Sequence, residues 1–467
     1  MNGLVICSHP LAAQAGAGIL RAGGNAVDAA IGVALSLCVV DPANCGFAGY
    51  GGYMTVKNAN QDDAWVVDFN TILAQDFDPR EIGLASRCGP FINGERSIAL
   101  PMVASGLAAA QREFGTLNMS DLARTALTLA REGFAVDANL AKALRWTEKR
   151  SNLFGADFNR IFCPQGRALR EDERLVQSDL ADTLDEFVAD PAAFFESRAF
   201  SRVKRHMEVN GVARWTEVCL QAQASVKKAI AWHGPGFSVF GPSLEESGFG
   251  ILLPALQHYV EEKDGPQEAW SPDAFVNGLK DAWAQRAAAT ATPEAVTKHT
   301  THFSVLDRTG TLVSCTFTHG PLWFGSGVVA PDTGLVMNCG MNLARYSRVR
   351  NRWAAVNNLT PVVVETALGA RYCMGAPGGS RIPAIALKLL IETVMGGAAL
   401  DDAINWPRVS VSPQGEIEAE IDANWPGAHR VLGPEEFYGP ASAIGVLRGG
   451  VVVAAVDRRC ASGVATV

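Results

Sequence analysis

The sequence predicts a mixed α/β fold in which stacked sheets are flanked by helices. The chain before Thr300 carries long segments with helical spacing, whereas the chain from Thr300 onward contains segments that alternate as strands do. The two patterns occur in blocks, which is typical of layered folds. With 467 residues, of which 48% are hydrophobic and only 19% charged, the chain can form a large buried core.

The N-terminal segment predicts two helices followed by a strand. Residues 11–22 place apolar side chains at helical spacing and end at Gly23-Gly24. The same spacing resumes over residues 25–40. Residues 45–54 are rich in glycine and lead into a strand, and these glycines form either a tight backbone turn or part of a substrate pocket. The sequence leaves both interpretations open.

Composition and spacing predict the remaining elements. Segments rich in Ala, Leu, Arg and Glu predict helices over residues 105–144 and 179–209, a further helix is expected within residues 266–293, and another covers residues 382–395. Strand-like composition marks residues 237–253, 302–306, 311–317, 361–365, 371–375, 404–407, 416–423 and 443–456. The polar end of residues 266–293 is a place where a cleavage-site linker could be exposed.

Charge and cysteine usage exclude several classes of function. The net charge of −8 argues against nucleic-acid binding, and no apolar run is long enough to span a membrane. The ten cysteines include no Cys-x-x-Cys pair, so no metal or cofactor is expected. The first residues lack a basic segment followed by an apolar one, and together with the scattered cysteines this predicts a cytoplasmic protein.

The segment that begins at Thr300 carries the strongest chemical signal. A threonine hydroxyl is a poor nucleophile unless a base lies beside it, and a threonine at a chain terminus has its own base in the freed α-amine. Thr300 begins a strand-like block after the polar segment, and Gly378-Gly379 could supply backbone N–H groups to an oxyanion. The chain would then be a precursor that cuts itself between His299 and Thr300.

Several stretches along nearly the whole chain resemble the γ-glutamyltransferase family of N-terminal-nucleophile hydrolases. They are residues 9–12, 20–30, 114–116, 130–134, 247–251, 300–307, 324–327 and 377–381. The resemblance implies a four-layer αββα sandwich formed by both fragments of a self-cleaved precursor. The large fragment would be residues 1–299, and the small fragment, residues 300–467, would start at the catalytic threonine and stay associated with it.

The family pattern also implies roles for individual residues. It makes Thr300 the nucleophile, Thr318 the second threonine that orients it, and Gly378 and Gly379 the oxyanion donors. Taken alone, Thr318 is more often an ordinary strand residue, and Gly378-Gly379 is more often a turn or the anion-binding start of a helix. The family context reverses both expectations. His302 and a second histidine at 319 are expected to be structural or to line the pocket.

The sequence departs from the family where the family binds the substrate's amino-acid head. Asn70 follows Asp68-Phe69 in place of the arginine that holds the glutamyl α-carboxylate, and an asparagine cannot replace that charge. Other departures are Gly320 in place of an asparagine, Asn342 and Leu343 within the run that grips the α-amine, and Asn357-Asn358 in place of paired serines. A standard γ-glutamyl substrate is therefore not expected.

A cluster of arginines lies in the segment before Asn357, which is shorter than in lid-bearing family members. It is either a solvated basic loop or a place where Arg345 or Arg348, with Arg350 and Arg352, binds a substrate carboxylate.

The sequence thus predicts a self-processing amidohydrolase or acyltransferase that cleaves a small-molecule amide through an acyl-enzyme on Thr300. One alternative is a true glutathione hydrolase or γ-glutamyltransferase with a rebuilt pocket. Another is an unprocessed, non-catalytic family member, which a denaturing gel would reveal as a single band.

Overall fold

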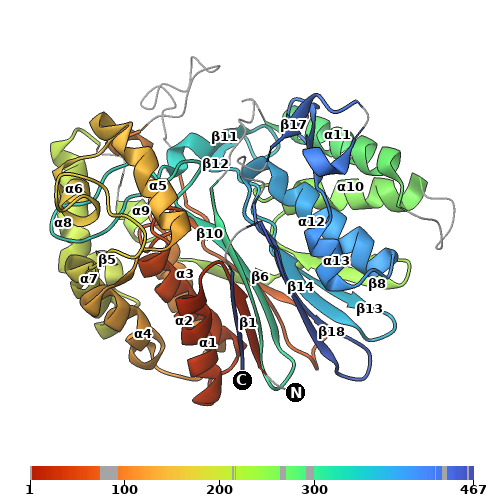
Figure 1. Cartoon of the computed structure of the whole chain (residues 1–467), viewed down its shortest axis with the longest axis horizontal. Helices are drawn as coiled ribbons and strands as arrows, with labels where there is room; N and C mark the ends of the chain where they lie inside the picture. Colours follow the sequence, from red (N-terminus) through yellow and green to blue (C-terminus); the bar gives the residue numbers. More distant parts are fainter. Residues whose placement is uncertain are drawn as a thin grey trace.

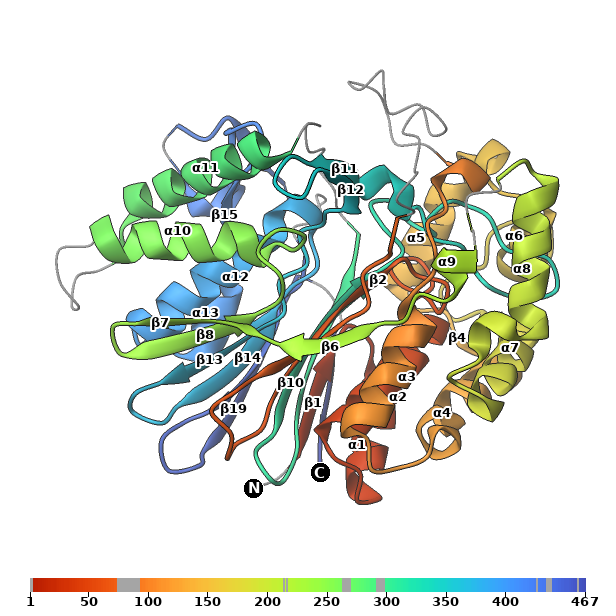
Figure 2. The same ribbon diagram turned by 180° about the vertical axis from the view of Figure 1, so that it is seen from behind.

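Two sheets are stacked face to face, and helices cover both outer faces (Figures 1 and 2). The computed structural model describes residues 3–73, 93–212, 215, 217–262, 270–290, 299–425, 427–433, 439–459 and 462–467. This four-layer αββα arrangement is the fold class expected from the sequence.

The first sheet has seven strands in the order β20-β1-β9-β10-β2-β3-β6, and every neighbouring pair is antiparallel. Its strands are β1 (Leu4–Cys7), β2 (Gly51–Lys57), β3 (Trp65–Asp68), β6 (Ser225–Lys228), β9 (Thr301–Leu306), β10 (Leu312–Thr318) and β20 (Gly463–Thr466). Asp307 accepts N–H groups from Thr309 and Thr311, which closes the turn between β9 and β10.

The second sheet has six antiparallel strands in the order β19-β18-β14-β13-β8-β7. Its strands are β7 (Ile230–Gly234), β8 (Phe237–Gly241), β13 (Val362–Thr366), β14 (Arg371–Gly375), β18 (Ser442–Val446) and β19 (Val452–Val456). Smaller sheets join β4 (Phe134–Ala135) to β5 (Arg174–Leu175), β11 (Ala344–Ser347) to β12 (Arg352–Ala355), and β15 (Val409–Val411) to β16 (Ile417–Glu420) and β17 (Arg430–Leu432).

The helices on the outer face of the first sheet come from the N-terminal half. They are α1 (Pro10–Arg21), α2 (Ala26–Val40), α3 (Val103–Phe114), α4 (Met119–Glu132), α5 (Ala138–Glu148), α6 (Ala156–Phe162), α7 (Ser178–Ala189), α8 (Arg198–Val209) and α9 (Glu217–Leu220). Helix α2 is buried along its whole length, which fits its nearly all-apolar sequence. It begins at a capping box in which Asn25 and Asp28 satisfy each other's backbone N–H groups.

The second sheet is covered by α10 (Phe249–Glu262), α11 (Pro272–Ala289), α12 (Ile382–Leu390) and α13 (Leu400–Asn405). Their apolar side chains pack with those of β8, β13 and β14 in one core, and a separate core lies between the first sheet and its helices. A smaller apolar cluster lies between the two sheets and includes Leu4, Ile6, Leu306 and Leu312.

Some sequence predictions are wrong in detail. Residues 404–407 do not form a strand, because Leu400, Ala403 and Ile404 have the spacing of a buried helical face and α13 ends just before Pro407. Strand character ends at Gly241, and the apolar residues from Phe249 onward begin α10. The structure also adds strands that the sequence pattern does not predict, among them β1, β3, β6, β7 and β20 of the two main sheets. Residues 443–456 form two strands, β18 and β19, instead of one. The polar end of residues 266–293, where the sequence predicts a cleavage linker, lies outside the described residues. The other predicted helices and strands are confirmed within a few residues.

Strands from both sides of the His299–Thr300 bond occur in each sheet. In the first sheet β1, β2, β3 and β6 precede this bond and β9, β10 and β20 follow it, and the second sheet is mixed in the same way. Within the described residues, no helix has the length and apolarity needed to cross a membrane.

Candidate active site

Four adjacent strand ends form one row across the first sheet. The pairing of Phe317 with Thr301 extends by one residue to place Thr318 opposite Thr300. Thr318 also pairs with Gly51, and the pairing of Tyr53 with Asp68 extends to place Asn70 opposite Gly51. Directly paired side chains share a face of a sheet. Thr300, Thr318 and Asn70 therefore lie in one row on the face that looks toward the second sheet.

The carbonyl group of His299 lies between the two threonine hydroxyls. Thr300 Oγ donates a hydrogen bond to the His299 oxygen, and Thr318 Oγ lies 3.1 Å from the same oxygen. Thr318 is itself oriented by Gly320, whose N–H donates to Thr318 Oγ at 2.9 Å. Thr300 is only 5% exposed, so bulk water has little access to the bond that precedes it. The chain thus places a hydroxyl beside the carbonyl that it would attack.

The space between the sheets becomes polar toward this row. Along β9 the residues on the inner face change from Leu306 to Ser304 and then to His302. His302 Nδ1 lies 2.8 Å from the hydroxyl of Thr316 on the paired strand. Burial lowers the pKa of His302 to about 3, so the imidazole is neutral at ordinary pH.

The structure therefore predicts a loss of stability in acid. His302 binds a proton in the unfolded chain below its ordinary pKa of 6.5 but stays neutral in the folded chain down to about pH 3. Stability due to this group is thus complete above pH 6.5 and falls as pH is lowered through this window, by at most about 4 to 5 kcal/mol. Urea unfolding between pH 4 and 7 measures the slope, which His302→Gln should reduce.

Other buried groups contribute to stability in the same pH range, and burial lowers the pKa of His9 and raises that of Glu246. The buried ring of His319, whose pKa is also lowered to about 3, acts in the same direction as His302. Burial raises the pKa of Asp41 from 3.8 to about 7, so this carboxyl acts in the opposite sense. An unchanged slope in His302→Gln would contradict the assignment.

Gly378 and Gly379 form a turn that follows β14 of the second sheet. Their φ angles of 137° and 61° lie in the region that favours glycine. Gly375, at the end of β14, lies against His302, because a Cβ atom at Gly375 would be 2.4 Å from the imidazole ring. The turn follows three residues later, and within the described ranges neither of its N–H groups has a hydrogen-bond partner.

Two buried arginine–carboxylate pairs fix this glycine turn. Arg381 directly follows it and binds Glu418 through Nε at 2.8 Å, with both side chains at most 4% exposed. On the other side, a Cβ atom at Gly439 would lie 1.9 Å from the Pro377 oxygen. The Gly439 carbonyl in turn accepts a hydrogen bond from Arg408, which pairs with a buried aspartate, Asp457. Removing one member of such a pair is costly, so the turn is rigidly held.

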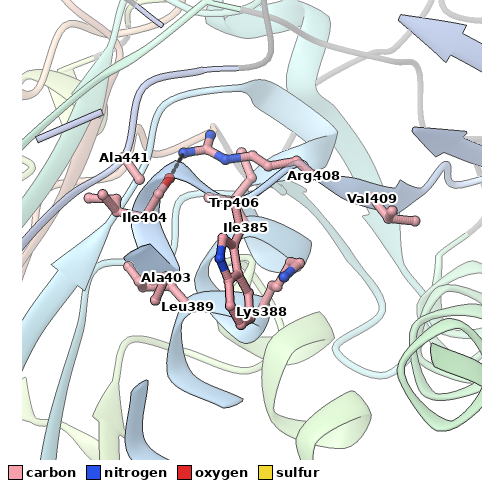
Figure 3. A pocket seen from close by; sticks show the side chains of 9 residues that line it. All are labelled: Ile385, Lys388, Leu389, Ala403, Ile404, Trp406, Arg408, Val409 and Ala441. Atoms are coloured by element: carbon pink, nitrogen blue, oxygen red, sulfur yellow. Dashed lines mark hydrogen bonds between the residues drawn. The ribbon is translucent and has the colours of Figure 1, made fainter. Parts of the chain in front are cut away.

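A small cavity beside Arg408 is not a substrate site. Its volume is about 10 Å³, close to the space of one water molecule. Figure 3 shows Lys388 and Trp406 at its wall, and Arg408 bonded to the Ile404 carbonyl. Lys388 is stabilised by Glu392 at 2.8 Å, and burial lowers its pKa. These groups support α12, which begins directly after the glycine turn.

Asn70 is buried at the far end of the row. Its Nδ2 donates to the Ala355 carbonyl at 2.7 Å, and its backbone N–H donates to Asp68 at 3.1 Å. Gly51 lies between Asn70 and Thr318 and must be glycine, because its φ is 141° and a Cβ atom would be 1.9 Å from the Phe69 oxygen. Gly51 is therefore required for the backbone conformation, and it is also a member of the row that the sequence did not single out. The choice between a tight turn and a pocket-lining role for residues 45–54 stays open.

The other predicted substrate-binding residues make contacts within the protein. Gly320 has a φ of 119° and lies against Cys339, so an asparagine would be strained there. Asn342 Nδ2 donates to the Cys339 carbonyl at 3.1 Å. Asn357 Oδ1 accepts the N–H of Leu359, and Asn358 Oδ1 accepts a bond from Arg286. Gly320 and Asn342 adjoin the row, whereas Asn358 faces α11.

The arginines of the shortened segment also have partners. Arg345 is buried and donates to the carbonyls of Asn342 and Ala344, and Arg348 donates to the Ala288 carbonyl at the end of α11. Arg350 pairs with Glu245 and Glu246, and Arg352 pairs with Glu246 at 3.1 Å. Both sets of contacts use the guanidinium groups to hold β11 and β12 against their neighbours. Binding of a substrate carboxylate by Arg345 or Arg348 stays a prediction.

Fold and site together define a class of protein. Four αββα layers with a buried threonine at the start of an inner strand are characteristic of N-terminal-nucleophile hydrolases. Within that class, the chain belongs to the γ-glutamyltranspeptidase family, whose model matches residues 12–298 and 280–467.

Curated relatives include both hydrolases and acylases. The chain is 25% identical to the glutathione hydrolase proenzyme of Escherichia coli (strain K12), over 87% of this chain and 80% of the relative. It is 27% identical to the acylase ACY 1 proenzyme of Pseudomonas sp. (strain SE83), over 87% of this chain and 82% of the relative. The cephalosporin acylase of Bacillus halodurans has the same fold, with a TM-score of 0.83 at 21% identity over 99% of this chain and 95% of that one.

Proposed function

We propose that the chain is the self-cleaving precursor of an amidohydrolase that uses Thr300 as its N-terminal nucleophile. The observation that carries this proposal is the His299 carbonyl held between the hydroxyls of Thr300 and Thr318. The cut would separate residues 1–299 from residues 300–467, and the mixed strands of both sheets would keep the two fragments together.

Self-cleavage would begin with attack of Thr300 Oγ on the His299 carbonyl carbon. The hydroxyl proton passes to the Thr300 nitrogen as the C–N bond breaks, which leaves an ester between His299 and Thr300 Oγ. Thr318 donates a hydrogen bond to the carbonyl oxygen while it carries negative charge. The α-amine of Thr300 is free from this step onward. Water then hydrolyses the ester, which releases the Thr300 hydroxyl and leaves a carboxyl group on His299.

Amide hydrolysis would repeat this chemistry on a substrate. The free α-amine takes the Thr300 hydroxyl proton while Oγ attacks the amide, and the N–H groups of Gly378 and Gly379 stabilise the oxyanion. The amine then passes the proton to the leaving nitrogen, which gives an acyl-enzyme. Water, or an acceptor amine if transfer occurs, releases the acyl group.

The substrate is proposed to be an amide without a γ-glutamyl head. Asn70 stands where the family places its carboxylate-binding arginine, and Gly320 cannot supply an asparagine side chain. The acylase names of two relatives agree with a substrate of another kind. Incubation with an amide library, followed by a mass spectrum of the small fragment, tests the proposal by detecting an acyl group on Thr300. A protein that stays whole and gains no acyl group would instead be a non-catalytic family member.

Removal of the Thr318 hydroxyl should slow both reactions. Thr318→Ala loses the hydrogen bond to the His299 carbonyl, so we expect cleavage and turnover to slow about ten- to a hundredfold. The fraction of cut chain against time on a denaturing gel measures the first effect. Thr318→Ser keeps the hydroxyl and should stay close to wild type. Equal rates in a folded Thr318→Ala protein would remove this residue from the site.

The pH–rate profile should report the free amine of Thr300. The amine must be neutral to accept a proton, so kcat/KM is expected to rise with pH up to a pKa of about 8. Measurement above pH 6.5 keeps this effect apart from the acid instability caused by His302. A flat profile with chemistry shown to be rate-limiting would contradict the role of the amine.

A further inference from the structure

Asn70 presents an unsatisfied hydrogen-bond acceptor at the far end of the active-site row. Its side chain is 7% exposed, and within the described structure Oδ1 is buried without a hydrogen-bond partner. The orientation of the amide is fixed, because Nδ2 donates at 2.7 Å to the Ala355 carbonyl, which can only accept. The oxygen, and not the nitrogen, is therefore the atom that lacks a partner.

A buried carbonyl oxygen without a partner is costly, and the cost disappears when a donor binds. An arginine at this position would offer N–H donors to a carboxylate. Asn70 offers the reverse, since its donors are used and its free atom is an acceptor. A substrate carboxylate would place its two acceptor oxygens against the acceptor Oδ1 of Asn70. Asn70 therefore disfavours an anion at this end of the row.

The surroundings of Asn70 offer no free donor on the side of Asp68. The Asp68 carboxylate accepts the Asn70 backbone N–H and pairs with Lys227 at 3.4 Å. On the other side, Ala355 pairs with Ala344, which belongs to an apolar cluster with Tyr50, Ala99, Met341 and Leu343. A ligand that reaches Asn70 therefore meets an apolar wall and one acceptor.

The row also sets the length of a ligand that would reach from Thr300 to Asn70. Asn70 lies three strand spacings from Thr300, which is about 14 Å between the backbones. Because both side chains lie on the same face, this spacing gives the length that an acyl chain on Thr300 would need to reach Asn70.

We propose that Asn70 Oδ1 is a specificity determinant that accepts a hydrogen bond from an uncharged donor at the distal end of the substrate's acyl chain. The substrate class is then an amide whose extended acyl part is largely apolar and ends in a carboxamide or hydroxyl group. This inference rests on the proposed amidohydrolase function and adds the chemistry of its substrate.

The test measures hydrolysis of straight-chain acyl anilides by the cleaved wild-type protein. At each chain length, three anilides are compared, whose acyl chains end in a carboxamide, a methyl ester or a carboxylate. At the best chain length, kcat/KM for the carboxamide substrate should be about tenfold or more above kcat/KM for the ester substrate. It should exceed kcat/KM for the carboxylate substrate by a still larger factor. Equal rates for carboxamide and ester, or a preference for the carboxylate, would overturn the inference.

Variants of Asn70 provide a second test of this inference. Asn70→Leu should abolish the preference for carboxamide over ester, whereas Asn152→Leu, an exposed asparagine on the helical layer, should keep it. Asn70→Asp retains an acceptor oxygen and should keep the preference for carboxamide while it rejects the carboxylate more strongly. An Asn70→Leu protein that folds and still discriminates as wild type does would contradict the role of Oδ1.

A binding measurement separates the inference from the proposed function. Calorimetry on the wild-type protein with the three free acids that the anilides would release does not require catalysis, and the carboxamide acid should bind about tenfold more tightly than the ester acid. If this preference is found without any hydrolysis, the hydrolase proposal fails and the Asn70 site stands. If hydrolysis occurs without the preference, the function stands and the Asn70 inference is overturned.

Discussion

The Thr300→Ala variant is expected to remain one uncut chain and to lose amide hydrolysis by a factor on the order of 10⁴ or more. The Thr300 hydroxyl is the group that contacts the His299 carbonyl from the residue next to it, and after cleavage the same hydroxyl would attack the substrate. A denaturing gel and an intact mass spectrum measure the first loss, and anilide hydrolysis measures the second.

Two matched variants control for folding. Thr300→Ser keeps a hydroxyl and should still cleave. Thr301→Val removes the adjacent hydroxyl, which faces the helical layer and contacts Ser8 at 3.0 Å, so it should leave cleavage intact. Cleavage of Thr300→Ala at the His299–Thr300 bond, at the wild-type rate, would refute the assignment.

The second large effect concerns γ-glutamyl substrates. We expect kcat/KM for a γ-glutamyl anilide to be roughly two to four powers of ten below that for an anilide of a preferred uncharged acyl chain. Each lost charged hydrogen bond costs about 1.5–3 kcal/mol, and under the proposed function the contacts to the α-carboxylate and to the α-amine would both be changed. Asn70 and Leu343 mark the two altered positions.

Asn70→Arg should narrow this difference by offering donors to the α-carboxylate, while the exposed control Asn152→Arg should not. Paired progress curves for the two anilides give the ratio directly. A clear preference of the wild-type protein for γ-glutamyl substrates would restore the interpretation as an ordinary glutathione hydrolase with a grip built from other residues.

Local pattern predicted much of the fold because the determining interactions are local. The turn at residues 307–310 and the alternation on either side of it fix the register of β9 and β10, and that register places Thr318 opposite Thr300. The capping box at Asn25 and the glycines after Arg21 define α1 and α2 in the same way.

Interactions between distant segments could not be predicted. Asn70 bonds to Ala355, 285 positions away, and Arg350 pairs with Glu246, 104 positions away. Strands β1 and β20 consist of four residues each and become strands by pairing with β9 and with each other, so their own sequences carry little signal. The anchoring of the glycine turn by Gly439 has no sequence signature either, because it depends on the close approach of Pro377.

Both sheets contain strands from before and after the His299–Thr300 bond, and this affects the kinetics of unfolding and refolding. In the order β20-β1-β9-β10-β2, segments from the two sides of the Thr300 bond are interleaved, so cleaved fragments cannot separate without breaking the ladders of both sheets. Cleavage would turn refolding into a second-order reaction while unfolding stays first-order. The cut protein should therefore persist when diluted yet recover poorly after denaturation, with a yield that depends on concentration, whereas the uncut chain refolds independently of concentration.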